Sequence, residues 1–307
     1  MRTILIVGGS GFVGRELVAE CVREGWRTVV ASRDPVTAEK TAPMGVTVLP
    51  LQAAADIERT LGDCPDALVN LAGENLQSGR WTEERKRAIL SSRVETTREL
   101  VASMSGWRQA PGVLVNASAI GFYGTDATRV WTENDPGGDS DFLADVVRRW
   151  ETEAIRAEEL GVRVVLARFG VILGRGGGAL GKLALPYRLG IGGTVGSGEQ
   201  WVSWVHMRDV VRMVLWSIDE KGIEGPLNVT APQPVTMRAL GRAMARVTGR
   251  PHWLTVPAIA LRLVFGEMAS LMLEGQRVLP QKAVEQGYAF YAEEIDAALR
   301  DLLGVNS

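Results

Sequence analysis

Three glycines near the start of the chain have the spacing of a phosphate-binding turn. Gly8, Gly11 and Gly14 form a G-x-x-G-x-x-G pattern between an apolar run at 4–7, which indicates a buried strand, and the amphipathic helical pattern that follows. Glycine lets the backbone approach a pyrophosphate, and the N-terminus of the following helix supplies N–H groups and the positive end of its dipole. The sequence therefore predicts a dinucleotide site, with a tight turn that binds no ligand as the alternative. The predicted contacts come from the whole turn: Gly8, Gly9, Ser10, Gly11, Phe12, Val13 and Gly14.

The end of the second predicted strand favours one cofactor over another. NAD-binding proteins carry an Asp or Glu about 20 residues after the glycines, where it holds the ribose 2′-OH. Here the strand ends in Ser32 and Arg33, and the first carboxylate, Asp34, comes one residue later. An arginine can pair with a 2′-phosphate that a carboxylate would repel, so Ser32 and Arg33 favour NADP(H) over NAD(H). The alternatives are an exposed Arg33 without a ligand, or an Asp34 that turns inward and restores NAD binding.

The composition is ordinary for a globular protein and argues against several classes. The chain has 307 residues, 46% of them hydrophobic, and a formal net charge of −2, which gives no electrostatic reason to expect a nucleic-acid partner. Its two cysteines make neither a metal site nor a disulfide framework, and Gly8 interrupts the N-terminal apolar run, so no signal peptide is expected. The apolar stretch 254–273 contains Pro257, Arg262 and Glu267, which indicates an amphipathic helix rather than a membrane span. We expect a cytoplasmic protein without a metal.

Strand and helix patterns alternate through the first half of the chain. Strands are expected at 4–7, 28–31, 46–49, 67–71, 113–115 and 162–167, and helices at 82–104, 145–160 and 237–247. Repeated units of this kind indicate an α/β fold with a Rossmann-type, doubly wound parallel sheet and a smaller, mainly helical C-terminal substrate region. We expect an NADP-binding domain over 1–174, to which 205–235 return, and a substrate region over 175–307 with a tail at 251–307.

Two glycine-rich segments follow the predicted sixth strand. Residues 175–181 read R-G-G-G-A-L-G, and residues 191–198 read I-G-G-T-V-G-S-G. They are expected to form loops around a site, with flexible surface linkers as the alternative.

Motifs along nearly the whole chain resemble the extended short-chain dehydrogenase/reductase superfamily. They are the glycine turn, N-L-A-G at 70–73, Tyr123-Gly124, E-x-x-P at 133–136 and V-H-M-R-D at 205–209. More narrowly, the chain resembles the atypical "epimerase family" subgroup, which is related to nucleotide-sugar epimerases and dehydratases. The motifs of that subgroup are N-L-A-G-E-N-L at 70–76, R-W at 80–81, S-R-V-E-T-T at 92–97, S-A-I-G-F-Y-G at 118–124 and G-S-G-E-Q-W-V-S-W-V-H at 196–206. The tail from about Pro251 resembles the small C-terminal domain of the subgroup, including G-Q-R-V-L-P at 275–280.

This resemblance implies a Rossmann fold, NADP(H) and, only loosely, a sugar or nucleotide-sugar substrate. It also implies that the cofactor's ribose and nicotinamide lie along Leu71, Ala72, Gly73, Glu74 and Ser118.

The catalytic pair of the superfamily is missing from the sequence. That chemistry uses a tyrosine whose pKa is lowered by a lysine four residues later, so that the phenol exchanges a proton while hydride moves. None of the tyrosines has such a lysine: four residues after Tyr123, Tyr187, Tyr288 and Tyr291 come Ala127, Ile191, Ala292 and Ile295. On the helix that should carry the pair, the tyrosine position falls on Phe142 or Leu143 and the lysine position on Val146 or Val147. The standard mechanism is therefore not expected.

Other residues are candidates for catalysis and substrate binding. Tyr123, Glu74 and His206 are candidates for proton transfer, with Ser118 (or Ala119, by a different alignment) orienting a substrate oxygen. The structural alternatives are a buried Tyr123 at a strand turn, a His206 bonded to Asp209, and a Glu74 that caps the next helix.

Arg93 takes the position of the asparagine in the superfamily's catalytic tetrad. It is a candidate for binding a substrate carboxylate or phosphate, and the alternative is an ion pair with a Glu on its own helix.

Aromatic residues are expected over the nicotinamide if the resemblance holds. Trp81, Trp201 and Trp204, with Gln200 and Ser203, would line a pocket suited to a sugar or a flat ring, although they suit a hydrophobic core equally well.

Two functions therefore remain open. The chain is an NADP(H)-dependent oxidoreductase or sugar-nucleotide epimerase, or it binds NADP(H) without turnover as a redox-responsive module. Superfamily members often pair through the helices expected at 82–104 and 145–160. Because five arginines make these helices highly charged for an obligate interface, a monomer or weak homodimer is expected; they are Arg87, Arg98, Arg148, Arg149 and Arg156.

Overall fold

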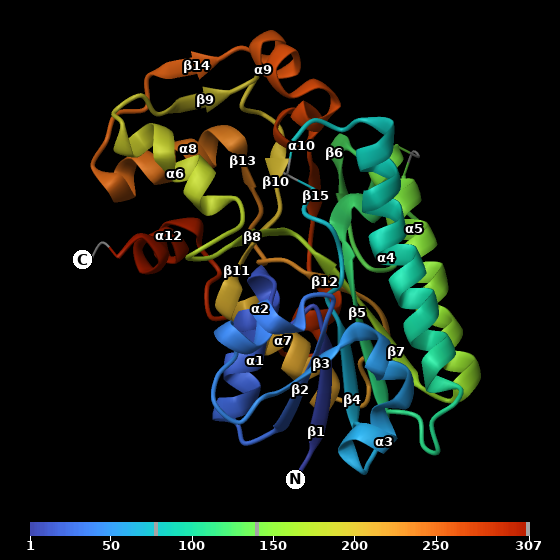
Figure 1. Ribbon diagram of the computed structural model, residues 1–307. Coiled ribbons are helices and arrows are strands. Elements are labelled where there is room, and N and C mark those ends of the chain that lie inside the picture. Colours follow the sequence, from blue (N-terminus) through green and yellow to red (C-terminus); the bar gives the residue numbers. More distant parts are fainter. Residues whose placement is uncertain (77–78, 139–140, 305–307) are drawn as a thin grey trace.

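A seven-stranded parallel sheet forms the centre of the protein. A computed structural model describes residues 1–76, 79–138 and 141–304 (Figure 1). The strand order is β12-β7-β5-β4-β1-β2-β3, and each neighbouring pair is parallel. The strands are β1 Thr3–Val7, β2 Arg27–Ser32, β3 Thr47–Pro50, β4 Ala67–Asn70, β5 Val113–Ala119, β7 Arg163–Phe169 and β12 Gly225–Val229. The predicted doubly wound α/β fold is confirmed, and the strand order reverses between β1 and β4, where such folds bind ligands.

Helices cover both faces of this sheet because its strands are apolar on both sides. In β1, Ile4 and Ile6 point into one core and Leu5 and Val7 into the other, as the two-residue period of a strand requires. The first core includes residues of α1 (Phe12–Arg23) and α7 (Met207–Asp219), and the second includes residues of α4 (Glu83–Met104) and α5 (Phe142–Ile155).

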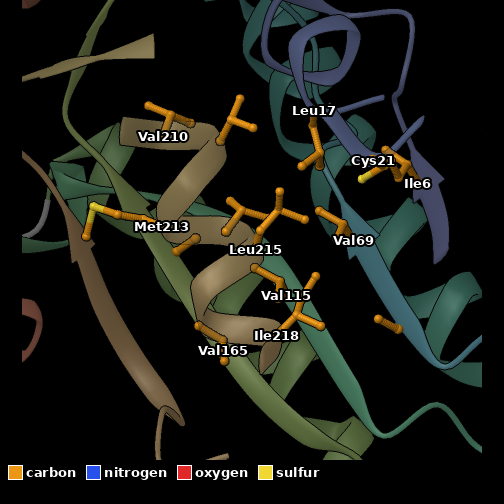
Figure 2. Packing of buried hydrophobic residues seen from close by; sticks show 14 of the residues in the cluster. Ile6, Leu17, Cys21, Val69, Val115, Val165, Val210, Met213, Leu215 and Ile218 are labelled. Atoms are coloured by element: carbon orange, nitrogen blue, oxygen red, sulfur yellow. The ribbon is translucent and has the colours of Figure 1, made fainter. Parts of the chain in front are cut away.

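Side chains of α7 pack on three neighbouring strands of the sheet in the first core. Figure 2 shows Leu215 and Ile218 of α7 against Val69, Val115 and Val165, which lie on the neighbouring strands β4, β5 and β7.

Short strand pairs and helices build the rest of the chain. The pairs are β6 Asp126–Trp131 with β15 Gln276–Val278, β8 Val171–Leu173 with β11 Trp204–His206, β9 Gly193–Val195 with β14 Leu254–Val256, and β10 Trp201–Val202 with β13 Val235–Thr236. The other helices are α2 Pro35–Thr41, α3 Ile57–Leu61, α6 Leu180–Arg188, α8 Met237–Thr248, α9 Ala258–Phe265, α10 Ser270–Leu273, α11 Gln281–Glu285 and α12 Ile295–Leu303. Four 3-10 turns complete the elements: η1 Leu51–Asp56, η2 Ile120–Tyr123, η3 Arg156–Leu160 and η4 Gly266–Ala269.

After residue 174 the chain returns twice to the part of the fold built by the first half of the sequence. First, α7 packs on the sheet and β12 forms its edge. Later, β15 pairs with β6, Gln276 Nε2 donates to the Ile120 carbonyl at 2.9 Å, and Ala283 of α11 is buried in the first core. The division into units at 1–174 and 175–307 stays a prediction.

Two local expectations differ from the structure. The stretch 254–273, interpreted as one amphipathic helix, is a strand followed by three short helical pieces, because Pro257 precedes α9 and Gly266 (φ +61°) ends it. No helix among the described residues is long and apolar enough to cross a membrane. The helix expected from residue 145 starts at Phe142, because the Asp141 side chain accepts a hydrogen bond from the Ala144 N–H at 2.7 Å and caps it.

Candidate functional site

The glycine turn lies at the reversal of strand order and has no room for a side chain at Gly8 or Gly14. A Cβ on Gly8 would stand 2.9 Å from the Leu71 backbone, and one on Gly14 would stand 2.3 Å from the Gly8 carbonyl oxygen. Gly8 also has φ +80°, which favours glycine. Gly11 caps α1 without a side-chain hydrogen bond, so the first N–H groups of this helix lack a side-chain acceptor. These residues fit a dinucleotide pyrophosphate, which needs close backbone approach and N–H donors.

The first glycine-rich segment packs directly onto this turn. Cβ atoms on Gly174, Gly177 and Gly178 would stand 2.5–2.9 Å from the ring of Phe12, the first residue of α1. The segment therefore forms an ordered loop over the start of α1 rather than a linker.

The end of β2 presents a cation and no free carboxylate. The Arg33 side chain is 63% exposed, and its Nη1 lies 3.8 Å from Glu74 Oε1. The Asp34 side chain accepts from the Thr37 N–H at 3.1 Å and caps α2 instead of turning toward the glycine turn. Ser32 is buried. Its hydroxyl donates to the Asp34 carbonyl and accepts from the Asp34 N–H, each at 3.1 Å.

The loop after β4 is shaped by buried amides. Asn70 Oδ1 accepts from the Ala72 N–H at 3.1 Å, while Asn70 Nδ2 donates to Thr97 Oγ1 at 2.8 Å and to Asn116 Oδ1 at 2.7 Å. These bonds hold residues 71–73 against the glycine turn, where the cofactor is expected.

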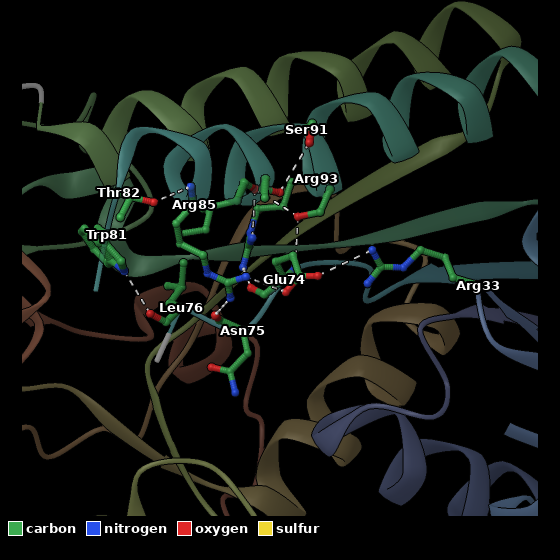
Figure 3. Close-up of polar contacts among 12 residues, drawn as sticks. Arg33, Glu74, Asn75, Leu76, Trp81, Thr82, Arg85, Ser91 and Arg93 are labelled. Atoms are coloured by element: carbon green, nitrogen blue, oxygen red, sulfur yellow. Dashed lines mark hydrogen bonds and ion pairs between the residues drawn. The ribbon is translucent and has the colours of Figure 1, made fainter. Parts of the chain in front are cut away.

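Three arginines surround Glu74 at the end of this loop, and we call Arg33, Arg85 and Arg93 the arginine cluster. Figure 3 shows them reaching Glu74 from the end of β2 and from two turns of α4. Arg85 Nη1 donates to Glu74 Oε2 at 3.2 Å, and Arg93 Nη2 donates to the Glu74 carbonyl at 3.0 Å. Glu74 does not cap α4, because Thr82 does so by accepting from the Arg85 N–H.

Ser118 lies at the end of β5 and is bonded to a buried ion pair. It is 2% exposed, and its Oγ donates to Glu151 Oε1 of α5 at 2.5 Å. Arg168 of β7 donates to both oxygens of Glu151, each at 2.8 Å. Because its proton is directed at Glu151, the Ser118 oxygen can accept a hydrogen bond from a ligand but has no proton left to donate.

Tyr123 belongs to the same buried network and is not exposed to solvent. Its side chain is 0% exposed, and its hydroxyl donates to Asn228 Oδ1 at 2.8 Å and accepts from Arg168 Nη1 at 2.9 Å. Burial raises the pKa of this phenol to about 12, despite the opposing effect of Arg168. This is the placement of the structural alternative, a buried tyrosine, and a role of Tyr123 in proton transfer stays a prediction.

The positions of the missing catalytic pair on α5 contain only apolar side chains. Val146 and Val147 are buried, and Phe142 packs edge-on against Trp81 with ring centroids 5.6 Å apart. None of these side chains can exchange a proton.

His206 is a buried helix cap rather than an exposed acid or base. Its Nδ1 accepts from the Arg208 N–H at 3.1 Å, so the neutral ring carries its proton on Nε2 and donates it to Asp301 Oδ2 at 3.0 Å. The expected partner, Asp209, instead accepts from the Tyr288 hydroxyl and from the N–H groups of Tyr291 and Ala292.

We expect His206 to make stability fall with decreasing pH. Burial lowers its pKa below the ordinary value, so the unfolded chain takes up a proton first as the pH falls through about 6.5. Stability should be unaffected above that pH, decline below it by at most about 1.4 kcal/mol per pH unit, and level off below the folded-state pKa. Urea unfolding at several pH values measures this.

The matched variant for this prediction is His206→Asn, which keeps a capping acceptor but does not titrate. The loss of stability at low pH should become smaller in His206→Asn. It should also become smaller in His252→Gln, since burial lowers the pKa of His252 as well. An unchanged profile in His206→Asn would contradict the prediction.

The three tryptophans expected at one pocket are not equivalent. Trp204 is 0% exposed and packs in the core with Leu240 and Leu299, which excludes it from a pocket wall in this structure. Trp81 and Trp201 are half-buried, and their indole N–H groups donate to the carbonyls of residues 76 and 127. Of their two expected companions, Gln200 donates to the carbonyls of residues 195 and 272. The Ser203 hydroxyl donates to the carbonyl of residue 276 and accepts from the N–H of residue 278.

The sequence patterns missed the ionic partners at the site. Arg85, Glu151 and Arg168 carry no motif, and Glu133, seen only as part of E-x-x-P, accepts from the Asn228 N–H at 3.0 Å. One signal was available: Arg168 follows four apolar residues in V-V-L-A-R, and a charge at the end of a buried strand requires a partner.

Comparisons with known proteins agree with this geometry. The NAD-dependent epimerase/dehydratase family matches residues 4–229, and a domain family of unknown function, DUF1731, matches residues 256–302. The epimerase family protein YfhF of Bacillus subtilis is 41% identical over 98% of this chain and 97% of its own.

Solved structures show the same relationship. The human epimerase family protein SDR39U1 (isoform 2), crystallised with NADPH, is 32% identical with a TM-score of 0.87, over 99% of this chain and 100% of that chain. A nucleoside-diphosphate sugar epimerase from Corynebacterium glutamicum is 31% identical with a TM-score of 0.79, over 100% of this chain and 59% of that chain. The glycine turn lies at the strand reversal, the family matches residues 4–229, and the Bacillus subtilis and human relatives match over nearly their whole length. The chain therefore belongs to the NAD-dependent epimerase/dehydratase family, as an atypical extended short-chain dehydrogenase/reductase.

Proposed function

We propose that the chain binds NADP(H) in preference to NAD(H) and acts as an oxidoreductase or nucleotide-sugar epimerase-like protein on a small molecule. The observation that carries the cofactor choice is the end of β2, where Arg33 is exposed and Asp34 is used as the cap of α2. A carboxylate at that point would repel a 2′-phosphate, whereas Arg33 attracts it. The human relative's structure with NADPH supports the same choice.

The cofactor is expected to contact three parts of the chain. The glycine turn would hold the pyrophosphate, Arg33 the 2′-phosphate with Ser32 beside it, and Leu71–Glu74 with Ser118 the ribose and nicotinamide. When bound, the nicotinamide supplies hydride transfer. The Ser118 oxygen, fixed by Glu151, would accept a hydrogen bond from the nicotinamide amide or from a substrate hydroxyl.

Arg33→Ala should remove the preference for NADPH. Loss of one charge-assisted phosphate contact costs on the order of 1.5–3 kcal/mol, so NADPH affinity should fall about tenfold or more while NADH affinity stays nearly unchanged. Nucleotide-stripped protein is titrated with NADPH, NADP⁺, NADH and NAD⁺, by tryptophan-to-nicotinamide energy transfer for the reduced forms and by calorimetry for all four. Arg23→Ala, which removes an exposed arginine on α1 paired with Glu20, is the control. Equal loss for NADPH and NADH in Arg33→Ala would contradict the cofactor choice.

A second candidate function is binding of NADP(H) without turnover. It is favoured by two of the candidates, since Tyr123 is buried and the Ser118 proton is directed at Glu151. A redox-responsive module must bind NADPH and NADP⁺ with different affinity, because only differential binding shifts a conformational equilibrium. A wide gap between NADPH and NADP⁺ in the same titrations, with no hydride exchange, would support this function over the first.

We further propose a monomer or weak homodimer. A groove of about 520 Å³ runs between α4 and α5 on the surface where superfamily members often pair. Its lining includes the exposed Arg87 and the ion pair of Arg98 with Glu153, whose desolvation would oppose a tight interface. A cytoplasmic location stays a prediction from the sequence.

A further inference from the structure

The arginine cluster carries more positive charge than its surroundings neutralise. Within the described part of the chain, Glu74 is the one carboxylate within ion-pair distance of Arg33 or Arg85, and Arg93 has no ion pair. Two guanidinium groups therefore share one carboxylate and the third bonds only the backbone of Glu74, beside the loop at which the cofactor is expected (Figure 3).

Arg93 is the least compensated of the three. Its Nη1 and Nη2 donate to the carbonyls of Ile89 and Glu74, at 3.1 and 3.0 Å, and its Cζ lies 5.3 Å from the centre of the Trp150 ring. Burial lowers its pKa to about 10, although Glu74 acts in the opposite direction. Two backbone carbonyls do not replace a counter-ion, so an anion bound at this guanidinium would offset the cost of keeping it out of water.

Arg85 supplies a second donor that is also incompletely used. Its Nη1 donates to Glu74 and its Nη2 to the Asn75 carbonyl, but its buried Nε has no hydrogen-bond partner. Native proteins rarely leave such a donor without a partner, and water or a bound ion can supply one. Arg85 and Arg93 lie two turns apart on α4, yet both reach the residue-74 loop, one at the carboxylate of Glu74 and the other at its carbonyl.

We infer that Arg85 and Arg93 form a subsite for a carboxylate or phosphate group of a substrate that binds beside the dinucleotide. The inference rests on the proposed function, because it assigns Arg33 to the 2′-phosphate and leaves the other two arginines for a second anion. Glu74 Oε2 already shows the chemistry, since it accepts from Arg85 as an anionic oxygen of the ligand would. The substrate is therefore expected to be acidic near the atom that reacts.

An anionic oxygen in this position has two possible sources. One is the substrate, and the other is the pyrophosphate of the cofactor. The pyrophosphate is expected at the glycine turn, where Gly8 packs against the backbone of Leu71, and Leu71 is two residues before Gly73. The Arg93 guanidinium in turn lies 3.0 Å from where a Gly73 Cβ would stand. The experiment must therefore separate loss of cofactor affinity from loss of a second anion.

The test is a calorimetric titration of NADP⁺-saturated protein with inorganic phosphate, and separately with acetate, at constant ionic strength in chloride. Wild type is expected to bind at least one of these probes. Arg93→Met and Arg85→Met should each weaken that binding about tenfold or more, the equivalent of one charge-assisted hydrogen bond. Their affinity for NADP⁺ should remain within about threefold of wild type.

Two further variants control for charge and folding. Arg87→Met removes a cation from the same helix on the side facing the α4–α5 groove, and it should bind phosphate or acetate as wild type does. Arg93→Lys keeps a cation without the planar fork, so it should fold and lose part of the probe affinity. If Arg93→Met does not fold, Arg93→Lys and Arg85→Met still carry the test.

The outcomes distinguish failure of this subsite from failure of the proposed NADP(H)-binding function. If NADP⁺ binds wild type but neither probe does, or if Arg93→Met and Arg87→Met bind the probe equally, the subsite is refuted and the cofactor assignment stands. If Arg93→Met loses NADP⁺ affinity tenfold, the anion is the cofactor's own and the subsite is again refuted. If no dinucleotide binds wild type, the proposed function fails and this inference fails with it.

Discussion

Arg168→Met should destabilise the protein by about 3–5 kcal/mol, the usual cost of breaking a buried ion pair by removing one partner. Arg168 is 2% exposed and donates to both oxygens of Glu151, which would be left as an unpaired buried carboxylate. The Tyr123 hydroxyl would lose a donor at the same time. Urea unfolding monitored by tryptophan fluorescence measures the loss, and addition of NADPH shows whether the remaining folded protein still binds its cofactor.

The size of this effect is tested by removing the second charge as well. The double variant Glu151→Leu/Arg168→Met should regain most of the lost stability, because no buried charge then remains. Arg98→Met is the matched control: its partner, Glu153, lies on the same helix as Glu151 but at the surface, and such pairs contribute about 1 kcal/mol or less. A loss below about 1 kcal/mol in Arg168→Met would show that the Glu151 carboxylate is not held by this pair.

Gly14→Ala should both destabilise the protein and prevent cofactor binding. The new Cβ would stand 2.3 Å from the Gly8 carbonyl oxygen and 2.7 Å from Gly9 Cα, and these are backbone atoms that cannot rotate away. We expect about 1–3 kcal/mol of lost stability from the forced shift. If the shift removes two N–H contacts to the pyrophosphate, NADPH affinity should fall about a hundredfold. Thermal unfolding and the NADPH titration measure the two effects separately.

Two other glycines serve as controls for this substitution. Gly181 lies in α6 with nothing within 4 Å of its added Cβ, so Gly181→Ala should leave NADPH binding unchanged and stabilise the helix by up to about 1 kcal/mol. Gly11→Ala meets one atom, at 3.2 Å, and has an ordinary backbone conformation, so it should fold and lose only cofactor affinity. Wild-type affinity in Gly14→Ala would mean that the turn does not bind the pyrophosphate.

The sequence predicts the fold because the signals for it are local. Buried parallel strands are continuously apolar, as Ile4–Val7 are, and the glycines mark where β1 ends and α1 begins. The expected strands and long helices accordingly appear within a few residues of their predicted positions. Where the pattern failed, at 254–273, apolar content resembled one long helix although Gly266 and Pro257 divide the segment.

The site was less predictable because its contacts join distant residues. Arg33 and Asp34 were recognisable from their position after a strand, but the role of Asp34 as a cap depends on its side-chain rotamer. The bond between Ser118 and Glu151 joins residues on β5 and α5, and no spacing in the sequence encodes it. His206 was expected beside Asp209, its neighbour in sequence, whereas it bonds Asp301 of a helix 95 residues away.

The pairing of β15 with β6 has a consequence for how the protein folds during synthesis. β15 pairs with β6, and the bond from Gln276 to Ile120 joins residues 156 positions apart. Until residues 276–283 have been synthesised, β6 lacks the strand with which it pairs and the first core lacks Ala283. Contacts so distant in sequence form slowly, and an unpaired strand in a nascent chain invites aggregation. The first core is therefore complete only after the segment beyond residue 275 has been synthesised.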